Sequence, residues 1–371
     1  MNITLRSDAS SQPQTAQTRS AENTNIRASI IIVSYNAKQK LMACLESASR
    51  SLPGDCELIV VDNASSEGNA DQIASGFPEV ALIRSPVNLG FAAGCNLGVR
   101  SARSRYLIFL NPDTLVESGW LDSLIAPLES DDGIGLVTPK ILLLATPDLL
   151  NTCGCDIHIT GLTLCRGIGR PRNSYAQIDE VGAISGAAFA IRRELFDKLG
   201  GFDEEMFLYM EDIDLSWRAR LAGYPTVYTP ESVVLHDYEL RITPLKLFWQ
   251  ERNRYLMLLK SFRWPTLFVL LPAYIVAELM TWSFVLLKDR SNITNKLRAY
   301  VWIISNWQAV MRKRKTTQAL RAVPDRVLLK STEYKLDFDQ AAGGAVASFA
   351  RFVFNPLFLA LRSICLAFVW W

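Results

Sequence analysis

Short, uniformly apolar segments alternate with amphipathic ones over the first third of the chain. Four runs of mostly aliphatic residues are predicted to be strands: residues 29–33, 57–61, 80–84 and 106–110. Three segments after them are predicted to be helices: residues 37–50, 91–104 and 119–128. Strands that are apolar on both faces and alternate with helices are typical of a parallel sheet covered on both sides. The pattern therefore predicts an α/β fold with a mostly parallel, doubly wound sheet.

Polar clusters follow three of the predicted strands directly. They are residues 34–36, 62–65 and 111–113. Ligands of such sheets bind outside the carboxyl ends of the strands, so we expect the three clusters to line one site. Each cluster alone is also typical of an ordinary turn after a strand.

A glycine-rich segment, residues 88–98, leads into the second predicted helix. Gly90 and Gly94 would let a ligand approach the backbone closely, or would let the helix pack against the sheet. The segment does not contain the GxGxxG fingerprint, which disfavours a dinucleotide site.

Three acids lie close together in residues 207–218, between aromatic and aliphatic residues. A helix is predicted to begin near Asp212. In that helix Asp214 pairs with Arg218 four residues later, which leaves Glu211 and Asp212 at the N-terminal tip, free to face a cleft. A solvated helix start, stabilised by the helix dipole, is the alternative interpretation.

Two segments near the end of the chain are long and apolar. Residues 265–287 are long enough to span a bilayer but contain Pro272 and Glu278. After a single crossing the basic run 312–315 would lie outside, which the positive-inside preference opposes, so an in-plane or re-entrant helix is favoured. Residues 349–371 combine two arginines with two terminal tryptophans, which is typical of an interfacial helix. A buried core helix is the alternative.

Length and composition narrow the classes of protein. The 371 residues are enough for a large α/β domain and a second module. Residues 1–27 are polar and have no apolar stretch of signal-peptide length, which predicts a disordered leader. The net charge of +2 does not indicate a nucleic-acid partner.

Seven cysteines are scattered along the chain, and we interpret them as reduced thiols in a cytosolic compartment. Four potential zinc ligands lie close together in the sequence: Cys153, Cys155, His158 and Cys165. The C-x-C spacing lacks a matching second pair, so buried or loop thiols are favoured.

The motifs VSYN, VDNAS, NLGFAAGCN, FLNPD, SGA, GGFDEEMFLYMEDIDLSWRARLAGY and VVLHDY occur in this order between residues 29 and 260. Their order and spacing resemble the family 2 glycosyltransferases, and within them the bacterial rhamnosyltransferase-like branch. The resemblance implies a GT-A fold that transfers a sugar from a nucleoside diphosphate donor with inversion at the anomeric carbon. We accordingly expect a catalytic domain over residues 28–240 and a helical, membrane-associating region over residues 241–371.

The resemblance implies roles for particular residues on the donor side. Asp62 would hold the base or ribose. The donor pocket would be completed by Ser34, Tyr35, Asn36, Asn63, Asn88, Gly90 and Asn111. Asp113 and His236 would hold Mg²⁺ or Mn²⁺, which offsets the charge on the departing diphosphate. The family often has Asp where this chain has Asn111, whose neutral oxygen implies weaker metal binding.

On the acceptor side, Asp212 would be the general base that takes the proton of the attacking hydroxyl. Glu211 would position the acceptor or raise the pKa of its neighbour, since two close carboxylates share a proton. Five residues would contact the acceptor: Ser185, Gly186, Asp214, Arg252 and Arg254. The two arginines would reach its phosphates, and the alternative is that residues 251–260 are an amphipathic connecting helix.

We therefore expect a membrane-associated inverting glycosyltransferase at the cytoplasmic face of the bacterial inner membrane, which extends a cell-surface polysaccharide. Its partners would be a nucleoside-diphosphate sugar, with rhamnose as the candidate sugar, and a lipid-linked glycan acceptor. A nucleotidyltransferase is disfavoured because the sequence SYNAKQK after the first strand has no glycines. A nucleotide-sugar-binding sensor or scaffold without turnover is the non-enzyme alternative.

Overall fold

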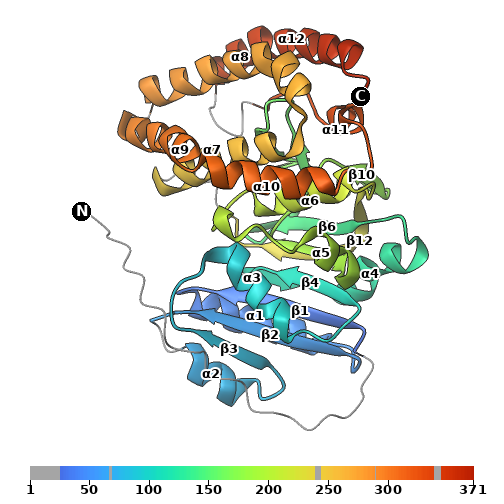
Figure 1. Cartoon of the computed structure of the whole chain (residues 1–371). Coiled ribbons are helices and arrows are strands. Elements are labelled where there is room, and N and C mark those ends of the chain that lie inside the picture. Colours follow the sequence, from blue (N-terminus) through green and yellow to red (C-terminus); the bar gives the residue numbers. More distant parts are fainter. Residues whose placement is uncertain (1–25, 67–68, 239–243, 289, 338–343) are drawn as a thin grey trace.

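A computed structural model describes residues 26–66, 69–238, 244–288, 290–337 and 344–371. Almost all of the predicted leader, residues 1–27, lies outside the described residues. The described chain has a sheet flanked by helices, followed by a group of helices only (Figure 1). The two long apolar helices of that group lie at the end of the molecule farthest from β3 and α2.

The four predicted strands are confirmed and form one half of the main sheet. They are β1 (Ala28–Ser34), β2 (Cys56–Asn63), β3 (Ala81–Ser85) and β4 (Tyr106–Leu110). Their order across the sheet is β4-β1-β2-β3, and every neighbouring pair is parallel. Their carboxyl ends therefore meet at one edge, as the sequence pattern predicts.

The other half of the sheet continues the order as β4-β11-β6-β12-β10. These strands are β6 (Leu136–Leu143), β10 (Asp179–Val181), β11 (Ala188–Arg192) and β12 (Thr226–His236). β11 is antiparallel to both β4 and β6, whereas β6 and β12 are parallel. The sheet is thus mixed rather than fully parallel, and β11 begins at the edge where β4 ends.

The apolar pattern does not predict β6 or β12. Pro139 and Pro230 interrupt their apolar runs, and the register between the two strands shifts between Thr229 and Val233. A shift of this kind accommodates a proline within a strand pair. The remaining short strands are β5 (Thr114–Val116), which pairs with β12, β7 (Thr146–Thr152), which pairs with β6, and the hairpin of β8 (Cys155–Ile157) and β9 (Thr163–Cys165).

Helices cover both faces of the sheet. On one face Ile30 and Ile32 pack with α1 (Lys38–Arg50), α2 (Asn69–Gly76) and α4 (Trp120–Ser130). On the other, Ile31 and Val33 pack with α3 (Gly90–Ser101), α5 (Arg193–Leu199) and α6 (Glu211–Leu221). Successive residues of β1 thus point to opposite cores, which explains why the strand is apolar throughout.

Glycines let α3 lie close to β1. A Cβ at Gly94 would come within 2.7 Å of Val33, and one at Gly98 within 2.6 Å of Ile31. Both distances are too short for real side chains. Of the two interpretations of Gly94, the structure therefore supports helix packing rather than ligand contact.

The C-terminal helices form a third core with the buried side of α6. They are α7 (Pro244–Ser261), α8 (Trp264–Lys288), α9 (Ile293–Ser305), α10 (Trp307–Ala319), α11 (Asp325–Lys330) and α12 (Gly344–Phe368). Two stretches, 264–287 and 350–368, are long and apolar enough to cross a membrane. Only 22% and 11% of their apolar windows are buried, which contradicts the alternative of a buried core helix for the C-terminal segment.

His158 ties the C-terminal helices to the sheet domain. Its Nδ1 lies 2.7 Å from Thr160 Oγ1 and its Nε2 lies 3.2 Å from the carbonyl oxygen of Tyr334. The edge of its ring meets Phe358 of α12 with the ring centres 4.4 Å apart. Both ring nitrogens are thus engaged, and no group of three or more metal-ligating His, Cys, Asp or Glu side chains occurs in the described part of the chain.

Acid should weaken this connection. Burial lowers the pKa of His158 to about 3, so the folded protein keeps the ring neutral where the unfolded chain, with a pKa of about 6.5, takes up a proton. The contribution of His158 to stability is therefore nearly constant above pH 7 and falls below it, by about 2 kcal/mol at pH 5. Burial raises the pKa of Asp156 to about 6, which acts in the opposite direction in the same range. We expect urea unfolding of the wild type between pH 7 and pH 5 to include the loss from His158. His158→Gln, which cannot titrate, should lack it, and equal pH dependence in the two proteins would contradict the prediction.

Candidate active site

The loops after β1 and β2 are joined by hydrogen bonds at the predicted donor edge. Asn36 has a left-handed backbone (φ 49°), and its Oδ1 accepts from the backbone N–H of Ser66 at 2.9 Å. The buried Asp62 accepts from the backbone N–H of Ser65 at 3.1 Å. The buried hydroxyl of Ser34 has no hydrogen-bond partner among the described residues. The two polar clusters therefore form one connected rim.

The glycine-rich segment is connected to the same rim by two asparagines. Asn63 donates to Asn88 Oδ1 at 3.1 Å and to the carbonyl of Gly90 at 3.0 Å. Gly90 has φ +78°, and a Cβ there would lie 2.5 Å from the carbonyl oxygen of Phe207. That carbonyl accepts from the backbone N–H of Phe91 at 2.7 Å. Gly90 is thus required for close approach of the segment that precedes the acids, rather than for approach of a ligand.

The predicted metal-binding residues lie together where β4 and β12 end. His236 Nε2 is 3.4 Å from Asp113 Oδ1, and His236 Nδ1 is 2.9 Å from Asn151 Oδ1. The carboxylate of Asp113 and the amide of Asn151 thus fix the orientation of the imidazole ring. Burial alone would raise the pKa of Asp113, but His236 and Lys40 together bring it below its ordinary value.

A cavity of about 580 Å³ lies between the loops after β1 and β4. Its lining residues are Asn36, Ala37, Lys38, Gln39, Lys40, Pro112 and Asp113. Tyr35, next to this lining in sequence, is 50% exposed. The cavity thus has basic side chains on the α1 side and a carboxylate on the other, which suits a phosphate-bearing ligand with a cation.

The start of α6, with its acids, is connected to the same edge of the sheet by the turn that precedes β11. The backbone N–H of Gly186 donates to Asp212 Oδ2 at 2.8 Å. The next residue, Ala187, accepts at its carbonyl from the backbone N–H of Asn111 at 2.9 Å. Two consecutive residues therefore contact the predicted base and the β4 loop, which places Asp212 at the cavity's end of the sheet.

Both acids have a raised pKa. For Glu211 the main cause is burial and the next is the neighbouring charge of Asp212. For Asp212 burial raises the pKa and the backbone N–H groups of Ile213 and Gly186 oppose it. Glu211 Oε2 has no hydrogen-bond partner in the ranges that the structure describes. Glu211 is thus buried rather than free to face a cleft as predicted, while Asp212 is partly exposed.

Of the predicted acceptor residues, Gly186 contacts Asp212, and Ser185 directly precedes Gly186 in the chain. Asp214 is fully buried and pairs with Arg218 Nε at 2.7 Å, which confirms the predicted i, i+4 pair. It also lies 2.7 Å from Lys260 Nζ. Its charge is therefore compensated inside the protein, and we exclude it from the acceptor site.

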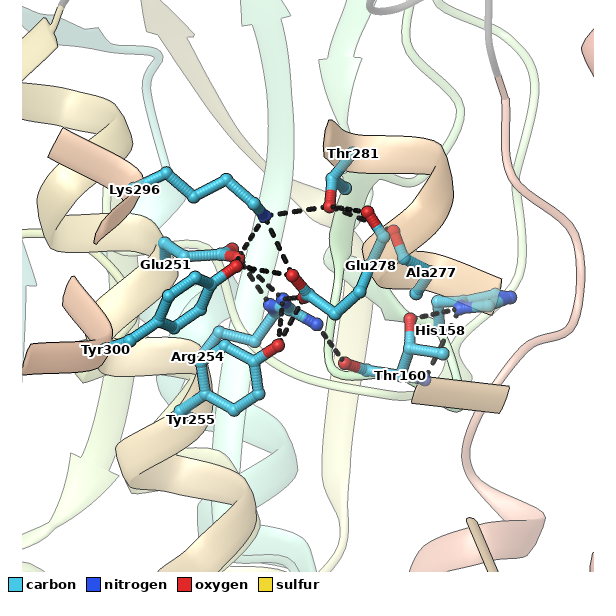
Figure 2. Close-up of polar contacts among 10 residues, drawn as sticks. All are labelled: His158, Thr160, Glu251, Arg254, Tyr255, Ala277, Glu278, Thr281, Lys296 and Tyr300. Carbon is cyan, nitrogen blue, oxygen red and sulfur yellow. Dashed lines mark hydrogen bonds and ion pairs between the residues drawn. The ribbon is translucent and has the colours of Figure 1, made fainter. Parts of the chain in front are cut away.

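The two predicted acceptor arginines are also buried. Arg254 pairs with Glu251 at 2.9 Å and with Glu278 of α8 at 2.6 Å, in a network that Lys296 of α9 joins (Figure 2). Arg252 donates instead to the side chain of Asn253. Neither guanidinium is available to acceptor phosphates, because both are buried and bound to other side chains. The amphipathic pattern of the sequence shows that a charge is present but not which side chain binds it.

Two contributors to this site are not predicted from the sequence. Asn151 orients His236 from β7, whose polar sequence gave no strand signal. Lys40 lies in a correctly predicted helix, and only its closeness to Asp113 across the cavity marks it as functional.

Comparison with known proteins agrees with this geometry. Residues 29–200 match the model of the family described as glycosyl transferase family 2. Over these residues the chain is similar to family 2, and it is a glycosyltransferase. The N-acetylglucosaminyl-diphospho-decaprenol L-rhamnosyltransferase of Mycobacterium tuberculosis is 28% identical over 232 residues, which cover 56% of this chain and 75% of that protein.

Another relative and a solved structure also resemble this chain. The pre-mycofactocin glycosyltransferase of Mycobacterium tuberculosis is 27% identical over 52% of this chain and 39% of its own length. Among solved structures, GalNAc-T7 with UDP, GalNAc and Mn²⁺ superimposes with a TM-score of 0.53 and 21% identity, over 64% of this chain and 48% of that one. With the mixed, mostly parallel sheet, this likeness confirms the predicted GT-A-type fold of the glycosyltransferase.

The contact of Gly90 with Phe207 can be tested by substitution. Gly90→Ala should lower the free energy of unfolding by about 3 kcal/mol, since it adds a clash to the cost of a left-handed alanine. Gly119 has nearly the same φ, +76°, but no atom within 4 Å of an added Cβ. Gly119→Ala should therefore cost only about 1 kcal/mol. Urea unfolding of both variants measures the difference, and equal losses would refute the close contact.

Proposed function

We propose that this glycosyltransferase moves a sugar from a nucleoside-diphosphate donor to a hydroxyl of a lipid-linked glycan, with inversion. The observation that carries the proposal is the Gly186–Ala187 turn, which connects Asp212, a half-buried carboxylate with a raised pKa, to the edge that holds Asp113 and His236. Base and diphosphate-binding groups then flank one reacting centre, as a direct displacement requires.

In the proposed reaction the acceptor oxygen attacks the anomeric carbon from the side opposite the diphosphate. The bond from that carbon to the diphosphate oxygen breaks, and its electron pair leaves with the diphosphate. The acceptor proton passes to the carboxylate of Asp212, whose oxygens are oriented by the backbone N–H groups of Gly186 and Ile213. Glu211, buried beside it, raises the proton affinity of the pair.

The residues at the end of β4 fit a divalent cation. Asn111 Oδ1 and Asp113 Oδ1 are buried, and neither has a hydrogen-bond donor among the described residues. His236 Nε2 lies 3.4 Å from the second of them. Two buried oxygens without a donor, beside an imidazole nitrogen, suit Mg²⁺ or Mn²⁺, which would neutralise charge on the departing diphosphate.

The nature of the acceptor is inferred from the relatives and from the apolar helices. The mycobacterial relative is named for a decaprenol-linked diphosphate acceptor and for rhamnose. A long polyprenyl chain has to be reached at a membrane, and this chain has two exposed apolar helices beside its catalytic part. We propose a polyprenyl-diphosphate glycan as the acceptor and rhamnose as the candidate sugar.

We propose that α8 and α12 lie in the plane of the membrane surface, at the cytoplasmic face of the bacterial inner membrane. One side of α8 is buried against the protein, through Leu270, Ala273 and Ala277. Its outer side exposes apolar residues at helical spacing: Phe268, Leu271, Ile275 and Leu279. α12 exposes Phe352, Leu359, Ile364 and Phe368. One buried and one apolar exposed side is the profile of an interfacial helix.

Turnover by wild type and Asp212→Asn tests the catalytic proposal. With a panel of nucleotide sugars, lipid extract as acceptor, and divalent metal present or absent, the wild type should release nucleoside diphosphate from one donor only when metal is present. Asp212→Asn should reduce kcat by about 10²–10⁴-fold while the donor KM changes little. The pKa of Asp212 is raised above the 3.8 of an ordinary Asp. As the pH decreases, the wild-type rate should therefore begin to fall before pH 3.8 is reached.

Asp197→Asn, an exposed change on α5, is the matched control and should retain wild-type turnover. Full activity in Asp212→Asn would overturn the assignment of the base. Nucleotide binding without release from any donor would instead support a sensor or scaffold.

Membrane association is tested with a pair of equally exposed residues. Leu279 on α8 is 64% exposed, and Ile178 in the sheet domain is 61% exposed. Leu279→Lys should weaken binding to phosphatidylethanolamine–phosphatidylglycerol vesicles at least about tenfold, because it removes a leucine side chain that would be buried in the lipid. Ile178→Lys should bind like the wild type. Vesicle flotation measures both, and identical flotation of the two variants would argue against the proposed surface.

A further inference from the structure

The four residues before the acid pair have an unusual backbone. Phe207 (φ 59°, ψ −61°), Tyr209 (φ 67°) and Met210 (φ 71°) all have positive φ without being glycine. The N–H of Leu208 donates to the carbonyl of Met206 at 2.6 Å, which closes a three-residue turn. Such conformations are costly for side-chain-bearing residues and persist only where surrounding contacts enforce them.

A single amide from the C-terminal helices provides those contacts. Asn253 of α7 is fully buried. Its Nδ2 lies 2.9 Å from the carbonyl oxygen of Met206, 3.1 Å from that of Leu208 and 2.7 Å from that of Tyr209. Three carbonyls of the strained segment thus converge on one NH₂ group, and the acids follow two residues later.

The orientation of this amide is fixed by its neighbour. Arg252 donates to Asn253 Oδ1 from Nε at 2.9 Å and from Nη2 at 2.7 Å. Its buried guanidinium lies between the rings of Trp249 and Trp302, at 4.4 and 4.5 Å from their centres. With the oxygen held by a cation, the NH₂ group has to face the carbonyls of the segment.

The segment is also held on its other side. The carbonyl of Phe207 accepts from Phe91 at the start of α3, and the ring of Phe207 stacks on Trp249 with the centres 5.0 Å apart. Trp249 and Asn253 are four residues apart and therefore lie on one side of α7. The segment is thus clamped between the donor-side helix and α7.

We propose that Asn253, oriented by Arg252, is a positioning residue that holds residues 206–210 so that Glu211 and Asp212 are aimed at the reacting centre. This rests on the proposed function of the acid pair. It makes α7, and with it the helical region, part of the catalytic apparatus rather than an anchor attached to it. Substrate need not touch Asn253 for its loss to slow transfer.

Asn253→Asp tests the proposal because it keeps the shape of the side chain and removes both donors. We expect kcat to fall about 10–100-fold with the donor KM within about twofold of wild type, since the donor contacts lie on other loops. The acidic limb of the pH–rate profile should also shift, because the environment of Asp212 changes. Arg252→Lys retains the positive charge but cannot donate two hydrogen bonds to Asn253 Oδ1. It should fold more readily than Asn253→Asp and show a smaller loss of kcat, again with little change in the donor KM and with a shifted acidic limb.

Gln318→Glu is the matched control. Gln318 of α10 donates from Nε2 to the carbonyls of Lys260 and Ser261 at 2.7 and 2.8 Å, and its oxygen is held by Arg321 at 3.1 Å. It has the same bonding pattern as Asn253, but its acceptors are at the end of α7 instead of before the acids. Its substitution should lower the melting temperature without changing kcat or the pH profile.

The outcomes separate this proposal from the one on which it rests. A wild type that is inactive with every donor, or an Asp212→Asn variant with full activity, removes the proposed function and this inference with it. If wild type turns over, Asp212→Asn does not, and folded Asn253→Asp and Arg252→Lys proteins keep the wild-type kcat and pH profile, the positioning role alone is overturned. A fall in kcat that the control reproduces equally also overturns it, because the effect is then general destabilisation.

Discussion

The pairing of β4 with the antiparallel strand β11 is the constraint on which the site depends. β4 delivers Asn111 and Asp113 to the sheet edge, and the turn that precedes β11 has to pass the same point. One residue of that turn accepts from Asn111 and its neighbour donates to Asp212. A fully parallel sheet would still bring the proposed diphosphate-binding residues to this edge. It would lack the turn before β11, whose Gly186 N–H donates to Asp212, the proposed base.

Charge compensation then separates three neighbouring acids. Asp214 turns inward and is neutralised by Arg218 and Lys260, so it stabilises the joint between α6 and α7. Glu211 and Asp212 have no cation paired with them among the described residues, and burial raises the pKa of both. Uncompensated burial is unfavourable for stability and favourable for a base, because it increases affinity for the acceptor proton.

Much of this was open to prediction from the sequence, and what was not has physical causes. The parallel strands and their polar ends follow from hydrophobic pattern alone, because β-branched runs followed by Asn, Asp and Ser have few other structures. β6 and β12 are not predicted because a proline interrupts the apolar run of each strand. Arg252 and Arg254 are misassigned because a charged residue in a sequence does not show which side chain it binds: Arg252 binds the adjacent Asn253, and Arg254 pairs with Glu278 of α8. Neutral amides such as Asn151 and Asn253 have no pattern that marks them.

The charged residue within α8 connects the proposed membrane surface to the proposed catalytic site. Glu278 looks like an obstacle to membrane contact in the sequence, but it faces Arg254 and Lys296 and receives hydrogen bonds from Tyr255 and Tyr300 (Figure 2). This network fixes which side of α8 turns inward, so the apolar side is left outward. Arg254 belongs to α7, the helix whose Asn253 holds the segment before the acids. In the proposed arrangement, a membrane surface that orders α8 would act on the same helix that holds the segment before the proposed base, through side chains one residue apart.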